Sequence, residues 1–373
     1  MKYKAIVISR GLHPPWNMGE VMMARNFTKI LAELYDEISV FSTVDKARGS
    51  YEELDVKPPF GIKFYPDEER LKIAVLGELN NNSHVEIHLI NTSLVKFLNV
   101  ARKARRVYFY QFAYSIYNDP KLILRSIGAL PLTYLNNIKI ITTSPCSYIR
   151  FHNFFRRNYY YVPTPIDPPL LNERPSLKEE INNKLKIFYL GHGSYLRFPY
   201  DKVFKVILRL KKESNNIGLN LYISKQGYAN YEEFTAGLKK TIKILNLEMV
   251  VKVHLKNLPE HEKWNIIREN HVLLFPSLTN SAIDPPIVVL EAMFMGKCII
   301  ATSTQSIPYL LGRSRGIIVD QQNLEDNVYK ALRMLEDNRM LLKEYGMSAK
   351  RWVAKIHSMN SIYNRVRKIL DEP

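Results

Sequence analysis

The sequence predicts an α/β protein built from two domains, each a parallel sheet with helices on both faces. Short apolar runs of strand type alternate with helical patterns along the chain, which is typical of parallel sheets connected by helices. The length of 373 residues and the hydrophobic content of 46% are enough for two ordinary cores and exclude a disordered or fibrous chain. A polar, proline-rich segment from Pro163 to Lys184 separates two series of strands and has the composition of a linker.

The strands and the closing helices define the expected domain boundaries. The first series of strands is Ala5–Ser9, Ile38–Ser42, His84–Ile90, Val107–Phe112, Lys139–Thr143 and Tyr159–Val162. The second series is Lys186–Leu190, Leu219–Ile223, Val250–His254, Val272–Phe275, Cys298–Ala301 and Gly316–Val319. Amphipathic segments at Leu324–Leu335, Arg339–Ala354 and Ile362–Ile369 predict three helices. We therefore expect an N-terminal domain at residues 1–168, a linker at 169–185 and a C-terminal domain at 186–357.

Composition excludes several classes of protein. The two cysteines, Cys146 and Cys298, lie far apart in sequence, so neither a disulfide framework nor a cysteine metal site is expected. The N-terminal apolar run is short and leads into a polar loop, which indicates a strand and not a signal peptide. No uninterrupted apolar stretch reaches about 18 residues, so no transmembrane helix is expected. We expect a cytoplasmic protein, soluble or peripheral on the inner face of the membrane.

The segment from Pro276 to Thr302 contains a strand end, a polar loop, a short helix and a buried strand in direct succession. Pro286 fits the first helical turn, and Gly296 fits a left-handed C-terminal stop. Free N–H groups at the helix start suit a phosphate, and Glu291, about one turn into the helix, can accept both hydroxyls of a ribose. The alternative is that Glu291 is a first-turn acid favoured by the helix dipole.

This segment resembles the nucleotide-sugar site of retaining glycosyltransferases of the GT-B fold, specifically glycosyltransferase family 4, or glycosyl transferases group 1. The residues that match the family motif are Pro276-Ser277, Leu290-Glu291-Ala292-Met293 and Gly296. In that family two glutamates are separated by seven residues; Ile283 stands at the position of the first one. The resemblance implies that Glu291 holds the ribose, and Asp284 is the candidate substitute for the missing contact to the donor sugar.

The same resemblance extends to the start of the helix and to the last helix of the chain. Pro286, Ile287 and Val288 belong to the loop and helix start that bind the donor in this family. In the GT-B fold, two Rossmann-like domains face a central cleft and the last helix, here residues 358–373, packs back on the N-terminal domain. The resemblance implies both features for this chain.

The loop Gly191–Pro199, after the first strand of the second series, resembles the diphosphate-binding loop of the family. His192 and Arg197 stand where the family has an Arg and, five positions later, a Lys. Cations there stabilise the negative charge of a departing nucleoside diphosphate, and Gly191 and Gly193 let the backbone approach it. Without the resemblance, we would interpret Arg197 as an ordinary solvated loop residue.

The long loop after the first strand resembles the first loop of the family. Gly19 matches the second glycine of a pair that lets the helix start approach the donor phosphates, whereas Met18 replaces the first. Only Gly11 and Gly19 are present, so the dinucleotide fingerprint G-x-G-x-x-G is absent and a nicotinamide site is not supported. A surface loop stiffened by Pro14-Pro15 is the alternative.

No metal site and no cofactor beyond the nucleotide sugar, UDP- or GDP-linked, are expected. Asp-x-Asp is absent from the sequence, and His84 and His88, four apart on a strand, stand roughly 13 Å from each other. We interpret each as an ordinary strand histidine. The resemblance implies front-face displacement, in which the leaving phosphate helps to deprotonate the acceptor.

The charge is strongly positive and unevenly distributed. The net charge is +17, and ten basic residues against Asp119 alone give +9 between Ala101 and Tyr160, a segment that also holds thirteen aromatics. This combination suits an anionic membrane surface or a lipid-linked acceptor, and also single-stranded nucleic acid. Core aromatics beside an ordinary solvated face are a third interpretation.

The predicted function is that of a retaining glycosyltransferase, which moves a sugar from a nucleotide sugar to a glycan or lipid-linked acceptor without metal. Two alternatives stay open. The missing first glutamate favours a catalytically degenerate protein that binds sugar nucleotides, and the charge favours a nucleic-acid-binding protein, although nucleic acid is the less expected partner.

Overall fold

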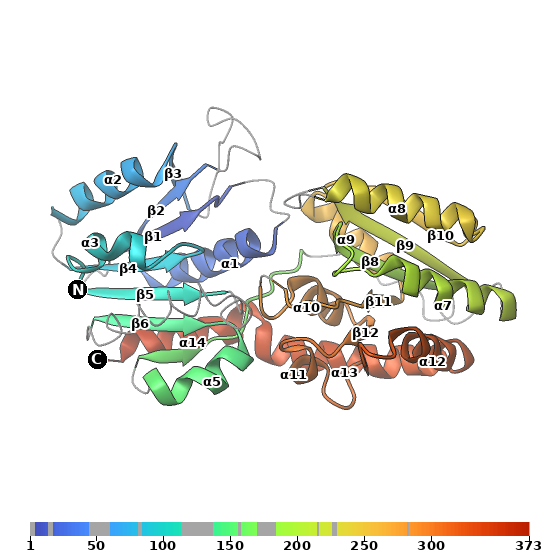
Figure 1. The fold of residues 1–373 in the computed structure, drawn as a ribbon. Coiled ribbons are helices and arrows are strands. Elements are labelled where there is room, and N and C mark those ends of the chain that lie inside the picture. Colours follow the sequence, from blue (N-terminus) through green and yellow to red (C-terminus); the bar gives the residue numbers. More distant parts are fainter. Residues whose placement is uncertain are drawn as a thin grey trace. The chain divides into compact units, whose positions relative to one another are not determined.

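The chain folds into two α/β units in a computed structural model (Figure 1). The structure describes residues 4–13, 18–44, 60–80, 84–112, 137–155, 158–169, 184–214, 216–225, 230–281 and 283–372. The first unit comprises Met1–Asp167, Ala282–Asp284 and Ile356–Pro373, and the second comprises Pro168–Ser281 and Pro285–Lys355. Most of the expected linker, residues 170–183, lies outside the described residues.

The first unit has a seven-stranded parallel sheet in the order β3-β2-β1-β4-β5-β6-β7. Its strands are β1 (Lys4–Arg10), β2 (Glu37–Thr43), β3 (Ile62–Tyr65), β4 (Val85–Ile90), β5 (Arg106–Gln111), β6 (Ile138–Thr142) and β7 (Tyr159–Tyr161). The central strand β4 is buried at every position, as expected for a parallel strand covered on both faces. All six strands predicted for this part are confirmed, whereas β3 was not predicted.

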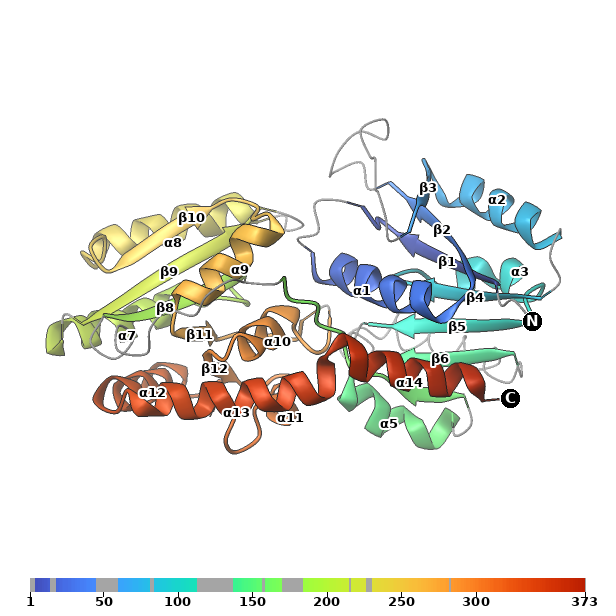
Figure 2. The same ribbon diagram turned by 180° about the vertical axis from the view of Figure 1, so that it is seen from behind.

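Helices cover both faces of this sheet. They are α1 (Gly19–Leu34), α2 (Glu68–Asn80), the 3₁₀ turn η3 (Val95–Phe97), α3 (Leu98–Ala101), α5 (Pro145–Phe155) and α14 (Met359–Asp371). The side chains of α2 and α3 form a buried cluster with β1, β4 and β5. On the opposite face α1 and α14 lie side by side, so the last helix of the chain completes the first unit (Figure 2).

Two cations of the sheet hold the C-terminal end of α14. The Lys139 ammonium donates to the carbonyls of Ile369 at 3.0 Å and Glu372 at 2.9 Å, and the Arg106 guanidinium donates to the Leu370 carbonyl at 3.1 Å. The last carbonyls of a helix have no intrahelical partner and carry partial negative charge, so cations are favoured there. These bonds fix the end of α14 beside the N-terminal ends of β5 and β6.

A buried polar chain runs beneath α1, and it fixes the protonation of His88. The Tyr35 hydroxyl donates to Glu86 at 2.6 Å, so at its contact with His88 Nε2, 2.9 Å away, it must accept. His88 Nδ1 then accepts from the Tyr110 hydroxyl at 3.0 Å. His88 is therefore the satisfied strand histidine that was predicted, and burial lowers its pKa to about 3.

Buried histidines make the fold sensitive to acid. Burial lowers the pKa of His271 and of His357 to about 4, as it lowers that of His88 to about 3. In the unfolded chain each group titrates near about 6.5, so below that pH the unfolded state binds more protons than the folded state. Their contribution to stability is complete above about pH 6.5 and is lost as pH falls towards 4.

We therefore predict that the free energy of unfolding, measured by urea at pH 7, 6 and 5, decreases with falling pH and that His88→Gln makes this slope shallower. The expected change in slope approaches about 1.4 kcal/mol per pH unit, since one fewer group takes up a proton on unfolding. His84→Gln, at an exposed position four residues earlier, is the matched control. Parallel slopes for the parent and His88→Gln would contradict the assignment.

The second unit has a six-stranded parallel sheet in the order β10-β9-β8-β11-β12-β13. Its strands are β8 (Leu185–His192), β9 (Ile217–Ser224), β10 (Val251–Leu255), β11 (Val272–Phe275), β12 (Cys298–Thr302) and β13 (Ile317–Val319). The helices are α7 (Tyr200–Glu213), α8 (Tyr231–Ile244), α9 (Glu260–Glu269), α10 (Ile287–Phe294), α11 (Ile307–Leu311), α12 (Leu324–Asp337) and α13 (Met340–His357). All six strands predicted here are confirmed, with ends that differ by at most two residues.

The helices of the second unit divide between the two faces of its sheet. Side chains of α7, α8 and α12 share one apolar core with the strands, and α9, α10 and α13 lie on the opposite face (Figure 2). Gly346 of α13 packs so closely on Gly296 that an added Cβ atom would lie 2.0 Å from the Gly296 carbonyl oxygen. This close packing fixes the end of α10, which is the helix with the family-like motif.

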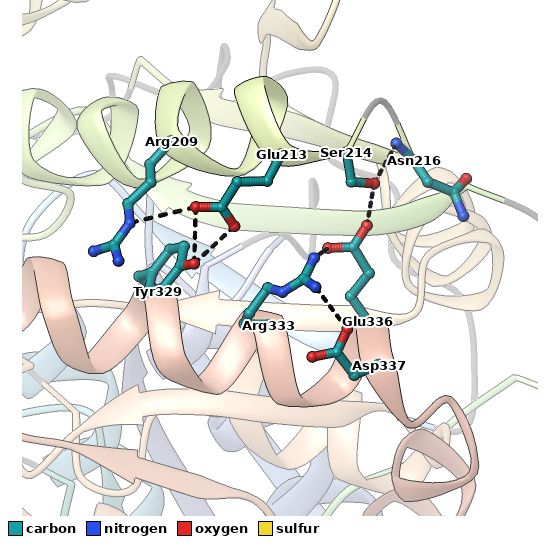
Figure 3. Close-up of polar contacts among 8 residues, drawn as sticks. All are labelled: Arg209, Glu213, Ser214, Asn216, Tyr329, Arg333, Glu336 and Asp337. Carbon is teal, nitrogen blue, oxygen red and sulfur yellow. Dashed lines mark hydrogen bonds and ion pairs between the residues drawn. The ribbon is translucent and has the colours of Figure 1, made fainter.

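A group of exposed hydrogen bonds and ion pairs joins α7 to α12 (Figure 3). The Arg209 guanidinium lies over the Tyr329 ring at 3.5 Å from its centroid, and the Tyr329 hydroxyl donates to Glu213 at 2.7 and 2.9 Å. Further along, Ser214 donates to Glu336, which also pairs with Arg333. Each exposed contact is weak, so the apolar core that α7 shares with the strands and α12 contributes more to its position. The N-terminus of α7 directly follows the loop Gly191–Pro199.

Candidate functional site

The second sheet has a topological switch point between β8 and β11. The chain continues from β8 to β9 on one side and from β11 to β12 on the other, so the loops after β8 and β11 lead away from each other. In open parallel sheets the crevice at such a point, outside the carboxyl ends of the strands, is the usual ligand site. The two family-like segments, Gly191–Pro199 and Pro276–Thr302, both begin at this edge, although they are far apart in sequence.

Hydrogen bonds hold the two loops together. The Leu278 N–H donates to the Leu196 carbonyl at 2.7 Å, and the Arg197 guanidinium donates to the Ser281 hydroxyl. Ser281 is itself held by Gln305, which exchanges two bonds of 2.8 and 2.7 Å with its backbone. Arg197 is thus half-buried and held across the crevice edge, so it is not an ordinary solvated loop residue.

His192, the second predicted cation, faces the other side of β8. It is the last residue of β8, and its Nδ1 lies 3.5 Å from the Ser224 hydroxyl at the end of β9. The Tyr189 hydroxyl and the Ser194 N–H both donate to its carbonyl. The partners of His192 and Arg197 therefore lie on opposite sides of the loop, and a phosphate between them stays a prediction.

The two glycines of this loop have packing roles of their own. A Cβ atom at Gly191 would lie 2.7 Å from the Tyr189 hydroxyl, and one at Gly193 would lie 2.9 Å from the Tyr231 ring. Contacts under 3.0 Å require something to shift. A larger residue would therefore have to displace the Tyr189 ring at Gly191 or the Tyr231 ring at Gly193, and the predicted approach of both glycines to a ligand is an additional role.

The start of α10 carries no side-chain cap. Pro286, predicted for the first helical turn, is the N-cap residue, so Ile287 and Val288 open the helix. Their N–H groups are among the four that an α-helix leaves without an intrahelical acceptor. At the other end Gly296 has φ +69° and donates to the Met293 carbonyl, while Lys297 donates to the Ala292 carbonyl. This Schellman motif confirms the predicted glycine stop.

Glu291 corrects one expectation about this helix. Its carboxylate was predicted to be open to the hydroxyls of a ribose, but its exposed fraction is 2% and it forms an ion pair with the Lys263 ammonium of α9. It is the fifth residue of α10, and the first turn contains no acid, so its interpretation as a first-turn acid is wrong. Helix α9 covers this face of the sheet, which buries both charges.

Lys263 is the site residue that the sequence reasoning missed. Its exposed fraction is 5%, which is unusual for a lysine without a partner. The available signal was its spacing, because Lys263 shares a helical stripe with the buried Ile266 and Ile267, three and four residues later. A lysine on an apolar stripe indicates a buried acid elsewhere in the chain, here Glu291.

We predict that Glu291→Gln destabilises the fold by about 3–5 kcal/mol, because it leaves a buried ammonium without its counter-charge. The double variant Lys263→Met/Glu291→Leu should recover most of this loss, since apolar residues of similar volume replace the pair. Urea unfolding measures both. Lys256→Met, which breaks the exposed Lys256–Glu262 pair, is the control and should cost no more than about 1 kcal/mol. A single variant as stable as the parent would show that the pair is not a buried ion pair.

Asp284 has structural partners in the first unit. The Ser144 hydroxyl donates to its carboxylate, the Thr143 hydroxyl donates to its carbonyl at 3.2 Å, and its own N–H donates to the Phe112 carbonyl at 3.1 Å. The residue is fully buried, with 0% of its surface exposed. Its contact with a donor sugar stays a prediction, and that contact would have to form beside or in place of these bonds.

Gly19 is the first residue of α1, in the first unit. No side chain caps this helix, whose N-cap residue is Met18. Four residues of the preceding loop, 14–17, lie outside the described residues and include the predicted Pro14-Pro15. The predicted role of Gly19 at the donor phosphates therefore stays a prediction.

The basic, aromatic segment Ala101–Tyr160 is only partly available at the surface. Arg106 and Lys139 hold α14, and buried aromatics of this segment, such as Tyr108 and Tyr110, belong to the core. Its exposed described cations are Arg102, Lys103, Arg105 and Arg150. Residues 113–136, 156 and 157 lie outside the described residues, and they include four of the ten cations. The charge on this segment thus serves the fold as well as the surface.

Two structural searches concern the described residues alone. None of their helices combines the length and apolarity needed to span a membrane. No three His, Cys, Asp or Glu side chains in the described ranges come together as metal ligands would.

Residues 178–352 match the family described as Glycosyl transferases group 1. No curated protein matches the chain significantly. Among solved structures, HepE of Anabaena in complex with UDP and glucose is similar, with a TM-score of 0.74, 12% identity and 99% of each chain covered. Sucrose-phosphate synthase of Thermosynechococcus elongatus has a TM-score of 0.71 at 13% identity, with 99% of this chain and 98% of that chain covered. A glycosyltransferase of Rickettsia africae has a TM-score of 0.70 at 13% identity over 100% of both chains. The predicted GT-B fold, with two Rossmann-like units, is confirmed.

Proposed function

We propose that the protein is a retaining glycosyltransferase that acts from a nucleotide-sugar donor on a glycan or lipid-linked acceptor, as the match of residues 178–352 to the family described as Glycosyl transferases group 1 suggests. The observation that carries this proposal is the switch point of the second sheet. There, hydrogen bonds hold the loop that contains Arg197 to the loop that precedes α10, and Glu291 lies in α10. The family match suggests the reaction class, and these residues supply the parts for a nucleotide sugar.

Each part matches one portion of a nucleoside diphosphate sugar. The guanidinium of Arg197 is always charged and suits a phosphate, and the N–H groups of Ile287 and Val288 suit another anionic oxygen. Glu291 offers its carboxylate to ribose hydroxyls, while Lys263 holds it in one orientation. In the transition state the leaving diphosphate gains negative charge, so fixed cations and N–H groups stabilise it more than the ground state.

The proposal includes transfer without a metal ion. Arg197, with His192 when it is protonated, offsets the charge of the diphosphate, which a divalent cation does in other phosphate sites. The donor nucleotide to test first is UDP, because HepE was determined with UDP, with UDP and glucose, and with UDP-glucose. GDP-sugars are the second choice.

One observation favours a second function, that of a degenerate protein that binds sugar nucleotides without turnover. Ile283 replaces the first motif glutamate, and Asp284 is engaged by Ser144 and Thr143. The chain then keeps the parts for phosphate and ribose but lacks a free carboxylate for the sugar. Measured transfer or donor hydrolysis distinguishes the two functions.

The acceptor side of the proposal rests on fewer residues. Ile149, which is 73% exposed, and the neighbouring Arg150 lie on α5, and further exposed cations lie at Arg102 and Lys103. Exposed residues of these kinds suit reversible contact with an anionic membrane, and sedimentation with anionic and neutral vesicles tests it. Because Arg106 and Lys139 are committed to α14, nucleic acid gains no support as a partner.

The donor site is tested with the double variant Lys263→Met/Glu291→Leu. It should unfold at nearly the same urea concentration as the parent and yet lose affinity for UDP, because the carboxylate that accepts the ribose hydroxyls is gone. We expect at least a tenfold increase in the UDP dissociation constant by calorimetry, equivalent to about 1.4 kcal/mol. Equal UDP affinity in a folded double variant would reject Glu291 as the ribose ligand.

Arg197→Ala tests the catalytic half. With the donor identified by a thermal-shift screen of nucleotide sugars, we predict a decrease in kcat of about 100-fold, as for other groups that stabilise a developing anion. Lys205→Ala, an exposed α7 cation paired with Glu325, is the control. Activity of the parent should survive EDTA. Unchanged turnover per folded Arg197→Ala molecule, or complete loss of parent activity in EDTA, would contradict this mechanism.

A further inference from the structure

The second unit contains a pocket of about 540 Å³ that shares residues 193–196 with the predicted diphosphate-binding loop but is lined by none of Arg197, Ile287, Val288 and Glu291. It lies between the loop after β8 and the start of α8, and its walls include Ser194, Tyr195, Tyr200, Asn230, Glu233 and Phe234. A volume of this size falls in the range of small-molecule sites, about 300–1,000 Å³.

One wall of the pocket is aromatic and held in place. The Tyr195 and Tyr200 rings meet edge to face with centroids 5.7 Å apart, and Tyr200 meets Phe234 at 5.5 Å. Tyr195 is 40% exposed, but its hydroxyl is anchored to Asp201 at 2.8 Å. The Tyr200 hydroxyl lies against Gly237 of α8, where a Cβ atom would lie 2.4 Å from it. The wall is therefore a rigid apolar surface open to solvent.

Other lining residues supply hydrogen-bonding groups that the fold does not use. Asn230 is the N-cap residue of α8, yet its side chain makes no cap bond. Within the described part of the chain, its amide, the Ser194 hydroxyl and the Glu233 carboxylate have no side-chain partner. They offer donors and acceptors side by side with the aromatic wall.

Charge excludes the most obvious ligands of such a protein. Glu233 lines the pocket, Asp201 lies beside Tyr195, and none of the described lining residues is Lys or Arg. A phosphate or a nucleotide would meet negative charge and no cation. The pocket suits an uncharged ligand with one apolar face and several hydroxyl groups.

We propose that this pocket binds a neutral hexose unit of a glycan, at a site separate from the nucleotide sugar. A pyranose ring has a face of C–H groups, which suits the aromatic wall, and an edge of hydroxyls, which suits Ser194, Asn230 and Glu233. The proposal goes beyond the transferase assignment and does not depend on the roles of Arg197 or Glu291.

The two sites use opposite sides of one loop. The Arg197 side chain extends from this loop to Ser281, in the segment that follows β11. The pocket lies beside the start of α8, the helix that follows β9. The pocket shares Gly193, Ser194, Tyr195 and Leu196 with the predicted diphosphate-binding loop, but Arg197 does not line it. A sugar in the pocket and a nucleotide at the switch point therefore do not compete for the same side chains.

Saturation-transfer NMR and calorimetry on the full chain test the proposal, with the methyl glycosides of glucose, galactose, mannose and N-acetylglucosamine as probes and glucuronic acid as the charged comparison. We expect at least one neutral glycoside to bind and glucuronic acid to bind at least fivefold more weakly. Tyr195→Ala and Asn230→Ala should each weaken binding of the neutral glycoside at least fivefold. Glu232→Gln, the exposed neighbour of Glu233, is the matched control and should leave it unchanged.

Two further experiments, one with a variant and one with UDP-glucose as competitor, distinguish this pocket from the donor site. Gly237→Ala displaces the Tyr200 ring without touching a polar group of the pocket, and should also weaken binding. Binding should persist with saturating UDP-glucose; if UDP-glucose abolishes it, the pocket is the donor-sugar subsite and the proposal is wrong. Failure of all four neutral glycosides to bind, in protein that still binds UDP, rejects the pocket without touching the transferase assignment. Loss of UDP binding alone rejects that assignment and leaves the pocket standing.

Discussion

The site of the second unit depends on the parallel pairing of β8 with β11. Val272 lies opposite Ile187 in this register, so both strands end at the same edge of the sheet. Because β9 and β12 extend the sheet in opposite directions, the loops that follow diverge and leave that edge uncovered. The Leu196–Leu278 and Arg197–Ser281 bonds then hold the two loops at a fixed separation. The positions of the residues proposed to bind the phosphates and the ribose all depend on this one strand pairing.

The fold was largely predictable because buried parallel strands are nearly continuous apolar runs. Val272–Phe275 was predicted with its observed ends, since nothing polar interrupts it. The strand Ile62–Tyr65 was missed because it lies at the sheet edge, half-exposed, and contains Lys63.

Within the site, the sequence located Glu291 but not its environment. Its partner, Lys263, lies 28 residues away on another helix, and the partner of Asp284 lies 140 residues away at Ser144. Periodicity can mark a residue as buried, but it does not identify the residue with which a buried polar side chain pairs.

The same limit applies to arguments from net charge. Lys139 and Lys263 are buried, and Arg106 is largely covered, because each meets an acceptor that the fold brings to it. Two of these cations bind the carbonyls at the end of α14 and one neutralises Glu291. A cation held in this way contributes to the formal charge of +17 but little to the attraction of an anionic partner. Surface potential therefore has to be judged from exposed side chains such as Arg102 and Arg150.

The replaced motif glutamate raises the question of how a donor sugar would be recognised. Ile283 has no polar group, and the carboxylate of Asp284 already accepts from Ser144, which also accepts from the N–H of Ser147 in the first turn of α5. That arrangement places the acid at a helix N-terminus, where the dipole stabilises its charge, so withdrawing it for a sugar hydroxyl is unfavourable. The N–H groups of Ile287 and Val288, which the proposal assigns to an anionic oxygen of the diphosphate, bind oxygen without selecting one hydroxyl pattern. A site of this kind would rely on nucleotide contacts for affinity and would discriminate weakly between donor sugars.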